Sequence, residues 1–324
     1  MTLIDEVMEG VSEYVEQAFK PSNKVKLLWS PGGDYYIFDD LNKVFMMAPP
    51  EVHTFVEVFG GSCWCSLNVS RQKFKIIVAN DIDSALMTFY KLVRDDPEGL
   101  MKRLSILPFS REIHRIAREI VEDPKADAVT KAVMLFYLSR TSMFGTGGFA
   151  VSKGERQLAK DLATVIAMIK EFAKKFRDVV LENKDFREVI KLYDSPRTLF
   201  YLDPPYVSAT EDQGRESYFR YPFTQGDLWS MAATLKTVKG YWVLKVAEDN
   251  YLIIKEVLPQ HEVLPIEKFK SFQKVVGGGR PKWRLVIAHN IKSSSKPRSS
   301  GSQTDLSRWL TNPLPRPKCE ASKG

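Results

Sequence analysis

The sequence predicts an α/β fold in which a mostly parallel β-sheet carries helices on both faces. Short apolar runs alternate with amphipathic stretches along most of the chain, which is typical of parallel strands joined by crossover helices. Of the 324 residues, 44% are hydrophobic, which is enough for a sizeable core and excludes a disordered or collagen-like chain. This length favours two domains, or one large α/β domain with an insertion.

Six short apolar runs are expected to form the strands of the sheet. They are residues 53–58, 75–80, 179–182, 198–202, 241–246 and 283–288. Residues 155–176 carry apolar side chains on one helical face and are expected to form a helix. Another helix begins after Thr224, because Asp227 three positions later completes a capping box.

Residues 91–151 interrupt this alternation. They contain helical and loop patterns without a convincing strand, so we interpret them as an insertion between the second and third strands. Within it, Arg111, His114, Arg115 and Arg118 follow at helical spacings and are expected to share a face. A solvated helix surface and a surface that contacts phosphate remain equally open interpretations of this pattern.

Most of the net charge of +7 lies in residues 291–324, which hold seven basic and two acidic residues. This segment is rich in Ser and Pro, so we expect a disordered basic tail, and any basic surface on the body must be a local patch. The acidic residues near Met1 and the lack of a long apolar run predict an intracellular protein with no membrane contact. Three cysteines and four scattered histidines give no disulfide framework and no metal-ligand pattern.

A glycine-containing turn follows the first predicted strand, in the run from Phe55 to Cys63. Glycines at a strand-to-helix turn let the backbone approach a ligand closely, although an ordinary tight turn has the same pattern. Asp81 ends the next predicted strand about twenty residues later, where a carboxylate accepts hydrogen bonds from ribose hydroxyls in nucleotide-type sites.

The run Asp203-Pro204-Pro205-Tyr206 follows the fourth predicted strand and is more specific. Two prolines fix the backbone, remove two amide donors and end the strand, leaving acceptors at the carboxyl edge of the sheet. These acceptors suit an exocyclic amine, and Tyr206 offers a ring on which a planar base can stack.

Together these motifs resemble the Dam-like DNA adenine-N6 methyltransferases of the α permutation class, over about residues 25–290. The resemblance implies a Rossmann-like class I methyltransferase sheet with a mainly helical target-recognition insertion. Its catalytic domain would comprise residues 1–90 and 152–290, its insertion residues 91–151 and its tail residues 291–324.

The same resemblance assigns roles to individual residues. The cofactor S-adenosylmethionine would contact six residues: Trp29, Phe59, Gly61, Asp81, Asp185 and Phe186. The catalytic residues would be Asp203, Pro204, Pro205 and Tyr206. An adenine flipped out of double-stranded DNA would stack on Tyr206 while Asp203 and the Pro204 carbonyl accept hydrogen bonds from its amine. Arg111, Arg115, Arg118 and Arg140 would bind DNA, the last from a loop ending at Phe149 that resembles a recognition loop of the family.

The chain departs from the family pattern at a few positions. Asp34 stands where the family has a lysine, and Cys63 replaces a small residue of the glycine loop. These departures leave open a catalytically weak DNA-binding protein on a methyltransferase scaffold. A cytosine methyltransferase and an RNA amine methyltransferase also stay open, because the chemistry of the Asp203–Tyr206 motif depends on the amine and not on the ring. Binding of S-adenosylmethionine separates the weak DNA-binding protein from an enzyme. A cognate restriction endonuclease is a further expected partner.

Overall fold

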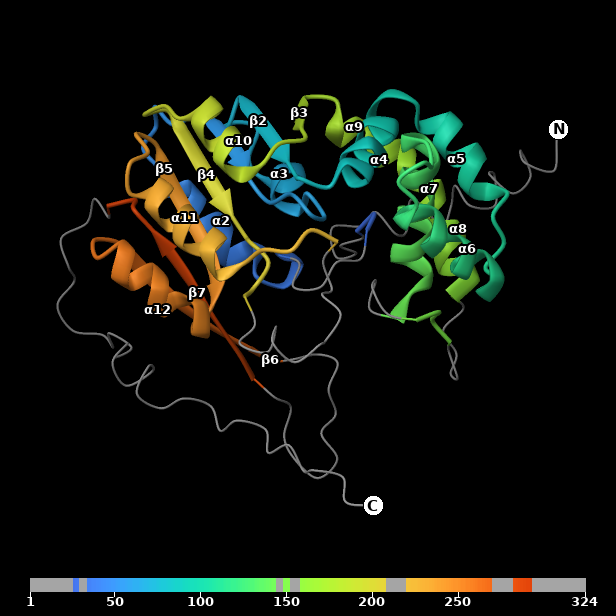
Figure 1. Ribbon diagram of the computed structural model, residues 1–324. Coiled ribbons are helices and arrows are strands. Elements are labelled where there is room, and N and C mark those ends of the chain that lie inside the picture. Colours follow the sequence, from blue (N-terminus) through green and yellow to red (C-terminus); the bar gives the residue numbers. More distant parts are fainter. Residues whose placement is uncertain are drawn as a thin grey trace, which may run out of the picture.

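The computed structural model describes residues 26–28, 34–143, 148–151, 158–207, 220–269 and 282–292. At its centre is a seven-stranded sheet with the order β3-β2-β1-β4-β5-β7-β6 (Figure 1). Strands β1 to β5 are parallel, and β7 runs antiparallel to both of its neighbours. The strands are β1 (Thr54–Glu57), β2 (Ile76–Asn80), β3 (Val179–Glu182), β4 (Thr198–Leu202), β5 (Tyr241–Ala247), β6 (Glu262–Phe269) and β7 (Lys282–His289).

All six predicted strands are present, and β6 is the strand that the apolar pattern missed. Its sequence contains Pro265 and charged residues, so no continuous apolar run marks it. It forms the edge of the sheet and pairs with β7 along its whole length. An edge strand accommodates proline because one side of its backbone has no ladder partner.

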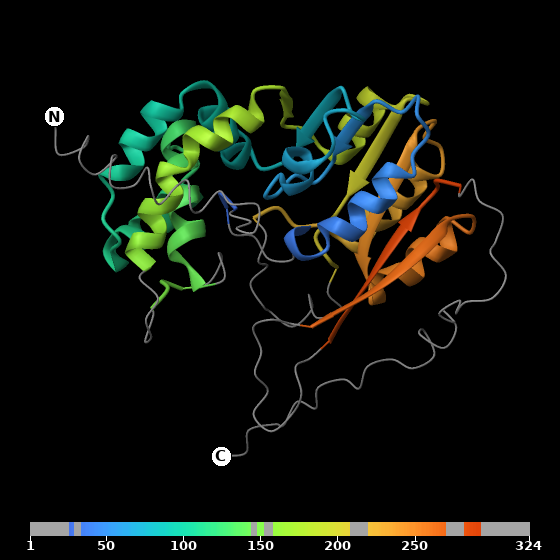
Figure 2. The ribbon, with the colours of Figure 1, turned by 180° about the vertical axis from the view of Figure 1, so that it is seen from behind.

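The strands alternate their side chains between two hydrophobic cores, as a sheet covered on both faces requires. On one face, Phe55 and Tyr201 pack against Phe45 of α2 (Phe38–Met46), with ring centroids 5.1 and 5.2 Å apart. On the other face, Phe200 and Leu244 belong to the core of three helices: α10 (Phe186–Tyr193), α11 (Gln225–Leu235) and α12 (Glu248–Val257). Figures 1 and 2 show α2 and these three helices on opposite sides of the sheet.

A group of helices lies beside the β3 edge of the sheet (Figure 1). It comprises α4 (Ser84–Asp95), α5 (Pro97–Ser105), α6 (Arg111–Glu122), α7 (Ala128–Thr141), α8 (Leu158–Ala167) and α9 (Ile169–Phe176). Helix α4 joins this group through Phe89, which stacks on Phe136 of α7, and Tyr90, which packs on Phe176 of α9. The assignment of residues 91–151 as a separate target-recognition insertion stays a prediction.

The helix predicted over residues 155–176 is divided into α8 and α9 at Met168. Its backbone remains nearly continuous, because the Met168 amide donates to the carbonyls of Thr164 and Val165. Among the described residues, none of the helices combines the length and apolarity needed to cross a membrane. Residues 293–324, most of the predicted basic tail, lie outside the described residues.

Candidate active site

The predicted site residues follow the carboxyl ends of neighbouring strands. Strand β1 lies between β2 and β4, so the turn after β1 is flanked by Asp81 on one side and Asp203 on the other. The backbone contacts agree, since the Val58 amide donates to Tyr201 of β4 and the Gly60 amide donates to Asn80 of β2. The strand order therefore brings the three motifs together at one edge of the sheet.

Both glycines of the turn have a structural reason. A Cβ added at Gly60 would lie 2.8 Å from the Asn80 carbonyl oxygen, so only glycine fits. Gly61 has a φ of +47°, and a Cβ added there would meet no atom within 4 Å, so this part of the turn borders open space. Cys63 also has a positive φ, 51°, which is unusual for a residue with a side chain. This turn offers backbone groups at close range to a ligand.

Asp81 holds the turn and retains acceptor capacity. One carboxylate oxygen accepts from the Gly61 amide and the other from the Asp83 amide, each at 2.9 Å. Each oxygen keeps a lone pair for a further donor. Burial raises the pKa of Asp81 to about 6. A half-buried carboxylate with two open acceptor positions fits the paired hydroxyls of a ribose.

Asn80 links the ends of three strands and was not identified from the sequence. Its side-chain amide donates to the carbonyls of Val58 and Lys184, at 2.9 and 3.0 Å, and its oxygen accepts from the Lys184 amide. The side chain is buried, so these bonds fix the spacing between β1, β2 and the residues after β3. Asn80 thereby positions both the glycine turn and Asp185.

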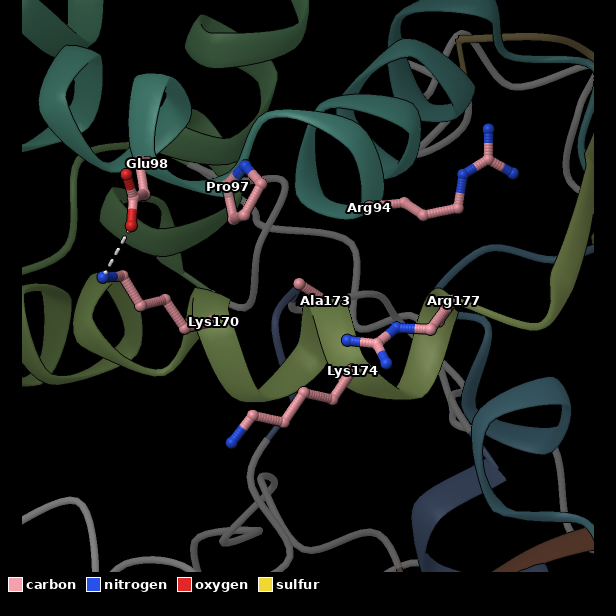
Figure 3. A pocket seen from close by; sticks show the side chains of 7 residues that line it. All are labelled: Arg94, Pro97, Glu98, Lys170, Ala173, Lys174 and Arg177. Atoms are coloured by element: carbon pink, nitrogen blue, oxygen red, sulfur yellow. Dashed lines mark hydrogen bonds and ion pairs between the residues drawn. The ribbon is translucent and has the colours of Figure 1, made fainter.

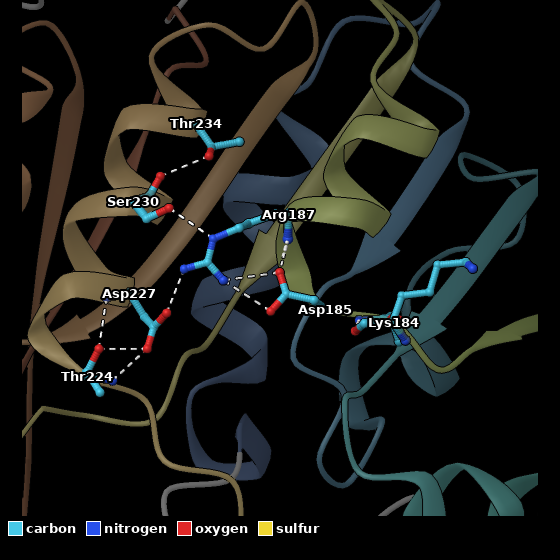
Figure 4. Close-up of polar contacts among 8 residues, drawn as sticks. Lys184, Asp185, Arg187, Thr224, Asp227, Ser230 and Thr234 are labelled. Atoms are coloured by element: carbon cyan, nitrogen blue, oxygen red, sulfur yellow. Dashed lines mark hydrogen bonds and ion pairs between the residues drawn. The ribbon is translucent and has the colours of Figure 1, made fainter.

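Asp185 and Phe186 lie at the beginning of α10. Figure 4 shows Arg187 directed toward Asp185 and Asp227. The Asp185 carboxylate accepts from the Arg187 amide at 2.8 Å and from its guanidinium at 3.1 Å. The same guanidinium binds Asp227 at 2.6 Å and lies 4.2 Å from the centre of the Phe186 ring. Asp227 also completes the predicted capping box with Thr224, which is confirmed. No local sequence pattern indicates this role of Arg187.

Three aromatic rings meet next to this network. Phe59 lies 5.7 Å from Phe186 and 5.6 Å from Phe223, measured between ring centroids. Phe186 is only 5% exposed, and Phe59 is the more accessible of the two predicted cofactor contacts. Phe223, which precedes α11, is a further member of this apolar wall that the sequence did not indicate.

Asp203 forms a buried charge cluster with two residues from distant parts of the chain. The Lys245 ammonium of β5 lies 2.5 Å from one Asp203 oxygen and 2.6 Å from Asp34, which begins the 3₁₀ helix η1 (Asp34–Tyr36). Burial raises the pKa of Asp203 above its ordinary value, against the effect of Lys245. Burial by itself would lower the pKa of Lys245, but the two carboxylates raise it well above its usual range. The cluster therefore holds a charged lysine in the buried interior of the sheet.

Glu57, at the end of β1, stabilises the short helix α3 (Trp64–Asn68). Its carboxylate accepts from the amides of Ser66 and Cys65, at 2.7 and 3.3 Å, and burial raises its pKa to about 8. Asp34, Glu57 and Cys65 place potential ligand atoms within 4.8 Å of one another. Since Asp34 already binds Lys245 and Glu57 binds backbone amides, this arrangement is explained without a metal ion.

A comparison with protein families shows which family this chain belongs to. Residues 31–271 match the family of D12 class N6 adenine-specific DNA methyltransferases. The chain belongs to this family. The predicted family is thus confirmed, with its fold class, its DNA-adenine methyltransferase activity and its cofactor S-adenosylmethionine.

Two relatives are type II methyltransferases. M.MjaIII of Methanocaldococcus jannaschii is 25% identical over 54% of this chain and 66% of its own length. M.CviBI of Paramecium bursaria Chlorella virus NC1A is 25% identical over 69% of this chain and 83% of its own length. A solved class I S-adenosylmethionine-dependent methyltransferase from Listeria monocytogenes matches 91% of this chain and 71% of its own at 11% identity, with a TM-score of 0.33.

The remaining predicted catalytic residues of this methyltransferase follow Asp203 directly. Pro204 is buried, whereas Pro205 and Tyr206 are partly exposed. The Tyr206 side chain packs against the core on the α2 face of the sheet. Trp29, the remaining predicted cofactor contact, lies outside the described residues.

The arginines predicted to bind DNA differ in their surroundings. On α6, Arg111 lies 5.0 Å from the centre of the Phe149 ring, and Arg115 pairs with Glu112 and Glu119 at 2.7 and 2.5 Å. Arg118 is exposed on the same helix. Arg140 of α7 is half-buried, and its Nε donates to the Leu27 carbonyl at 2.7 Å.

His114 does not share the exposed face of these arginines. It is 5% exposed, and its Nδ1 lies 2.9 Å from the Thr141 hydroxyl of α7. The reason is that α6 packs on α7 along the side that carries His114. Phe149, which forms a β-bridge with Ser142, packs against His114, so the end of the predicted recognition loop is anchored on α6.

A separate basic pocket of about 260 Å³ lies at the other end of the helical group (Figure 3). It is lined by Arg94, Pro97, Glu98, Lys170, Ala173, Lys174 and Arg177. Three of its cations pair with acidic neighbours: Arg94 with Asp95, Lys170 with Glu98 and Lys174 with Glu171. Arg94 also donates to the carbonyl of Val179, the first residue of β3, which places the pocket at the edge opposite the catalytic motif.

Proposed function

We propose that this methyltransferase carries out the transfer to the exocyclic amine of adenine with Asp203, Pro204, Pro205 and Tyr206, within a specific sequence of double-stranded DNA. The observation that carries the proposal is the position of Asp203. Its carboxylate is held by a buried ammonium at the carboxyl end of β4, beside the glycine turn of β1. The Asp203 carboxylate is thus a hydrogen-bond acceptor held in a fixed position beside the proposed cofactor-binding residues.

On the cofactor side, five of the described residues would hold S-adenosylmethionine. Asp81 would accept hydrogen bonds from the ribose hydroxyls, and Asp185 and Phe186 would contact the adenine ring. Phe59 and the turn at Gly61 would lie along the remainder of the molecule. When bound, the cofactor supplies an electrophilic methyl group on a sulfonium centre.

On the substrate side, the target adenine has to leave the duplex before its amine reaches Asp203. Flipping costs a few kcal/mol of stacking and pairing, and stacking on Tyr206 would offset part of it. Asp203 and the Pro204 carbonyl would each accept a hydrogen bond from the amine. This orients the nitrogen lone pair toward the methyl donor, so that positioning supplies much of the rate.

Sequence recognition would come from α6 and the loop that ends at Phe149. Arg111 is the strongest candidate for a base contact, because its guanidinium lies on Phe149 and is therefore held in place. Arg115 and Arg118 would contact the DNA from the same surface. Arg140, bonded to the Leu27 carbonyl, would act close to the target base.

The partners and location follow from this function. Double-stranded DNA is the substrate, so the enzyme would work on DNA inside the cell. The names of the relatives as type II methyltransferases support a cognate restriction endonuclease that recognises the same sequence. Protection of modified DNA from that endonuclease is the direct test of this part of the proposal.

The decisive experiment compares the wild-type enzyme with Asp203→Ala. Incubation of duplex DNA with labelled S-adenosylmethionine, followed by nucleoside analysis, should give N6-methyladenine for the wild type only. Losing a charged hydrogen bond to the reacting group should cost about 2–4 kcal/mol of transition-state stabilisation. Calorimetry should show nearly unchanged cofactor binding, since Asp81 is intact. Substantial turnover by Asp203→Ala, or label in cytosine or RNA, would contradict the proposal.

A further inference from the structure

The position of Lys245 is unusual for a lysine. It lies in the central part of β5, its side chain has no exposed surface, and its neighbours Val243 and Ile287 belong to the apolar core. A charged side chain in such a place is costly unless it is paired. Stability alone would favour an apolar residue here, which points to another role.

The sheet register explains which groups it pairs with. Leu244 of β5 lies beside Leu202 of β4, so the next residues along the two parallel strands are Lys245 and Asp203. On the other side of its ammonium lies Asp34, whose side chain is only 6% exposed. Of the three residues, Asp203 is the one that borders solvent, with 19% of its side chain exposed.

From this geometry we propose that Lys245 is the positioning residue of Asp203, with Asp34 holding Lys245 in place. The ammonium holds Oδ2 of Asp203 at 2.5 Å, while 19% of the Asp203 side chain stays exposed to meet the substrate amine. One ammonium between two carboxylates gives the cluster a net negative charge, which suits an amine that becomes positive as it is methylated. The inference rests on the proposed role of Asp203 as the acceptor.

The charges of this cluster predict opposite effects for two sets of substitutions. Removing Lys245 makes the ionised form of Asp203 less favourable, because its positive partner is lost. Removing Asp34 makes the ionised form of Asp203 more favourable, because Lys245 then pairs with Asp203 alone. The other titratable side chains around the cluster are Lys26, Glu57, Cys65, Tyr201 and Tyr206. They are unchanged in both variants, so they affect the two profiles alike.

The test measures kcat against pH for Asp34→Asn/Lys245→Met and for Asp34→Asn. The double variant removes one positive and one negative charge together, so the net charge of the buried cluster is unchanged by the substitution. Its kcat should fall about 10- to 100-fold near neutral pH, the usual effect of losing a partner that orients a functional group, and its acid limb should move about one pH unit upward. The acid limb of Asp34→Asn should move downward.

Arg284→Met is the matched control, because it removes a different ion pair, between Arg284 of β7 and Glu248 of α12 at 3.5 Å. Its acid limb should stay in place, and calorimetry should show unchanged S-adenosylmethionine binding in all variants. If Asp203→Ala is inactive but the pH profile of either folded variant coincides with that of the wild type, the inference is overturned. Activity of Asp203→Ala would instead refute the proposed function, so the two failures are distinguishable. If the double variant does not fold, the direction of the Asp34→Asn shift decides.

Discussion

Replacing Asp81 by alanine should weaken S-adenosylmethionine binding far more than it slows turnover at saturating cofactor. The Asp81 carboxylate has two oxygens, and each already accepts one backbone amide at 2.9 Å, from Gly61 and Asp83. One acceptor position on each oxygen is left for a ribose hydroxyl. In the proposed function, catalysis depends on Asp203 at the end of β4, which the substitution does not touch.

The magnitude follows from these bonds. Two charge-assisted hydrogen bonds to the ribose would be lost, at about 1.5–3 kcal/mol in total after exchange with water. This corresponds to a rise in Kd of about 10- to 150-fold. The amides of Gly61 and Asp83 also lose their acceptor, so the thermal midpoint should fall as well.

Calorimetry on the purified protein measures the Kd, and Asp83→Ala is the matched control. Asp83 lies in the same turn, but its carboxylate caps α4 and binds Arg220 at 3.1 Å. The control should therefore lose stability with much less effect on cofactor affinity. An unchanged Kd in Asp81→Ala, or equal weakening in both variants, would refute the assignment of Asp81 to the ribose.

Four further predictions concern pH and DNA. Because burial raises the pKa of Asp81 to about 6, cofactor affinity measured by calorimetry should fall as pH decreases through 6, and Asp81→Asn should remove this dependence. Burial raises the pKa of Glu57 to about 8, so the folded state keeps a proton that the unfolded state releases at lower pH. Stability is therefore lost as pH rises toward 8. In Glu57→Gln, thermal midpoints should decline less over that range. Arg111→Ala should weaken binding to the cognate duplex by about 1–3 kcal/mol and relax sequence choice. Arg115→Ala should have a smaller effect on binding, because Glu112 and Glu119 already pair with Arg115. Equal weakening on cognate and non-cognate duplexes would mean that this face contacts only phosphates. Deleting residues 293–324, which spares Ile291 because that side chain is buried in the core, should lower affinity for all sequences alike. It should reduce the salt slope by about 0.9 for each DNA phosphate that the tail neutralises in the full chain. A change in which adenine is methylated would contradict this.

The sequence by itself determined the class of sheet and the positions of the predicted catalytic and cofactor motifs along it. Six strands were predicted because each is a local apolar run, and such a run can be read from the sequence without knowing the tertiary arrangement. The motif from Asp203 to Tyr206 was recognised for the same reason, since its prolines act on neighbouring backbone. Strand β6 was missed because Pro265 and the charged residues at both ends of the strand leave only a short interrupted apolar run.

The tertiary structure alone decided how the charges of the site are partnered. Asp34 and Lys245 are 211 positions apart, and nothing in their local sequences connects them. Their contact exists because β5 lies beside β4 and η1 lies against the same face of the sheet. The arginine network of Arg187 and the burial of His114 likewise depend on which helices pack together. Ion pairs between distant segments depend on strand order and helix packing. Hydrophobic periodicity predicts the type of each element but neither its order in the sheet nor its packing partners.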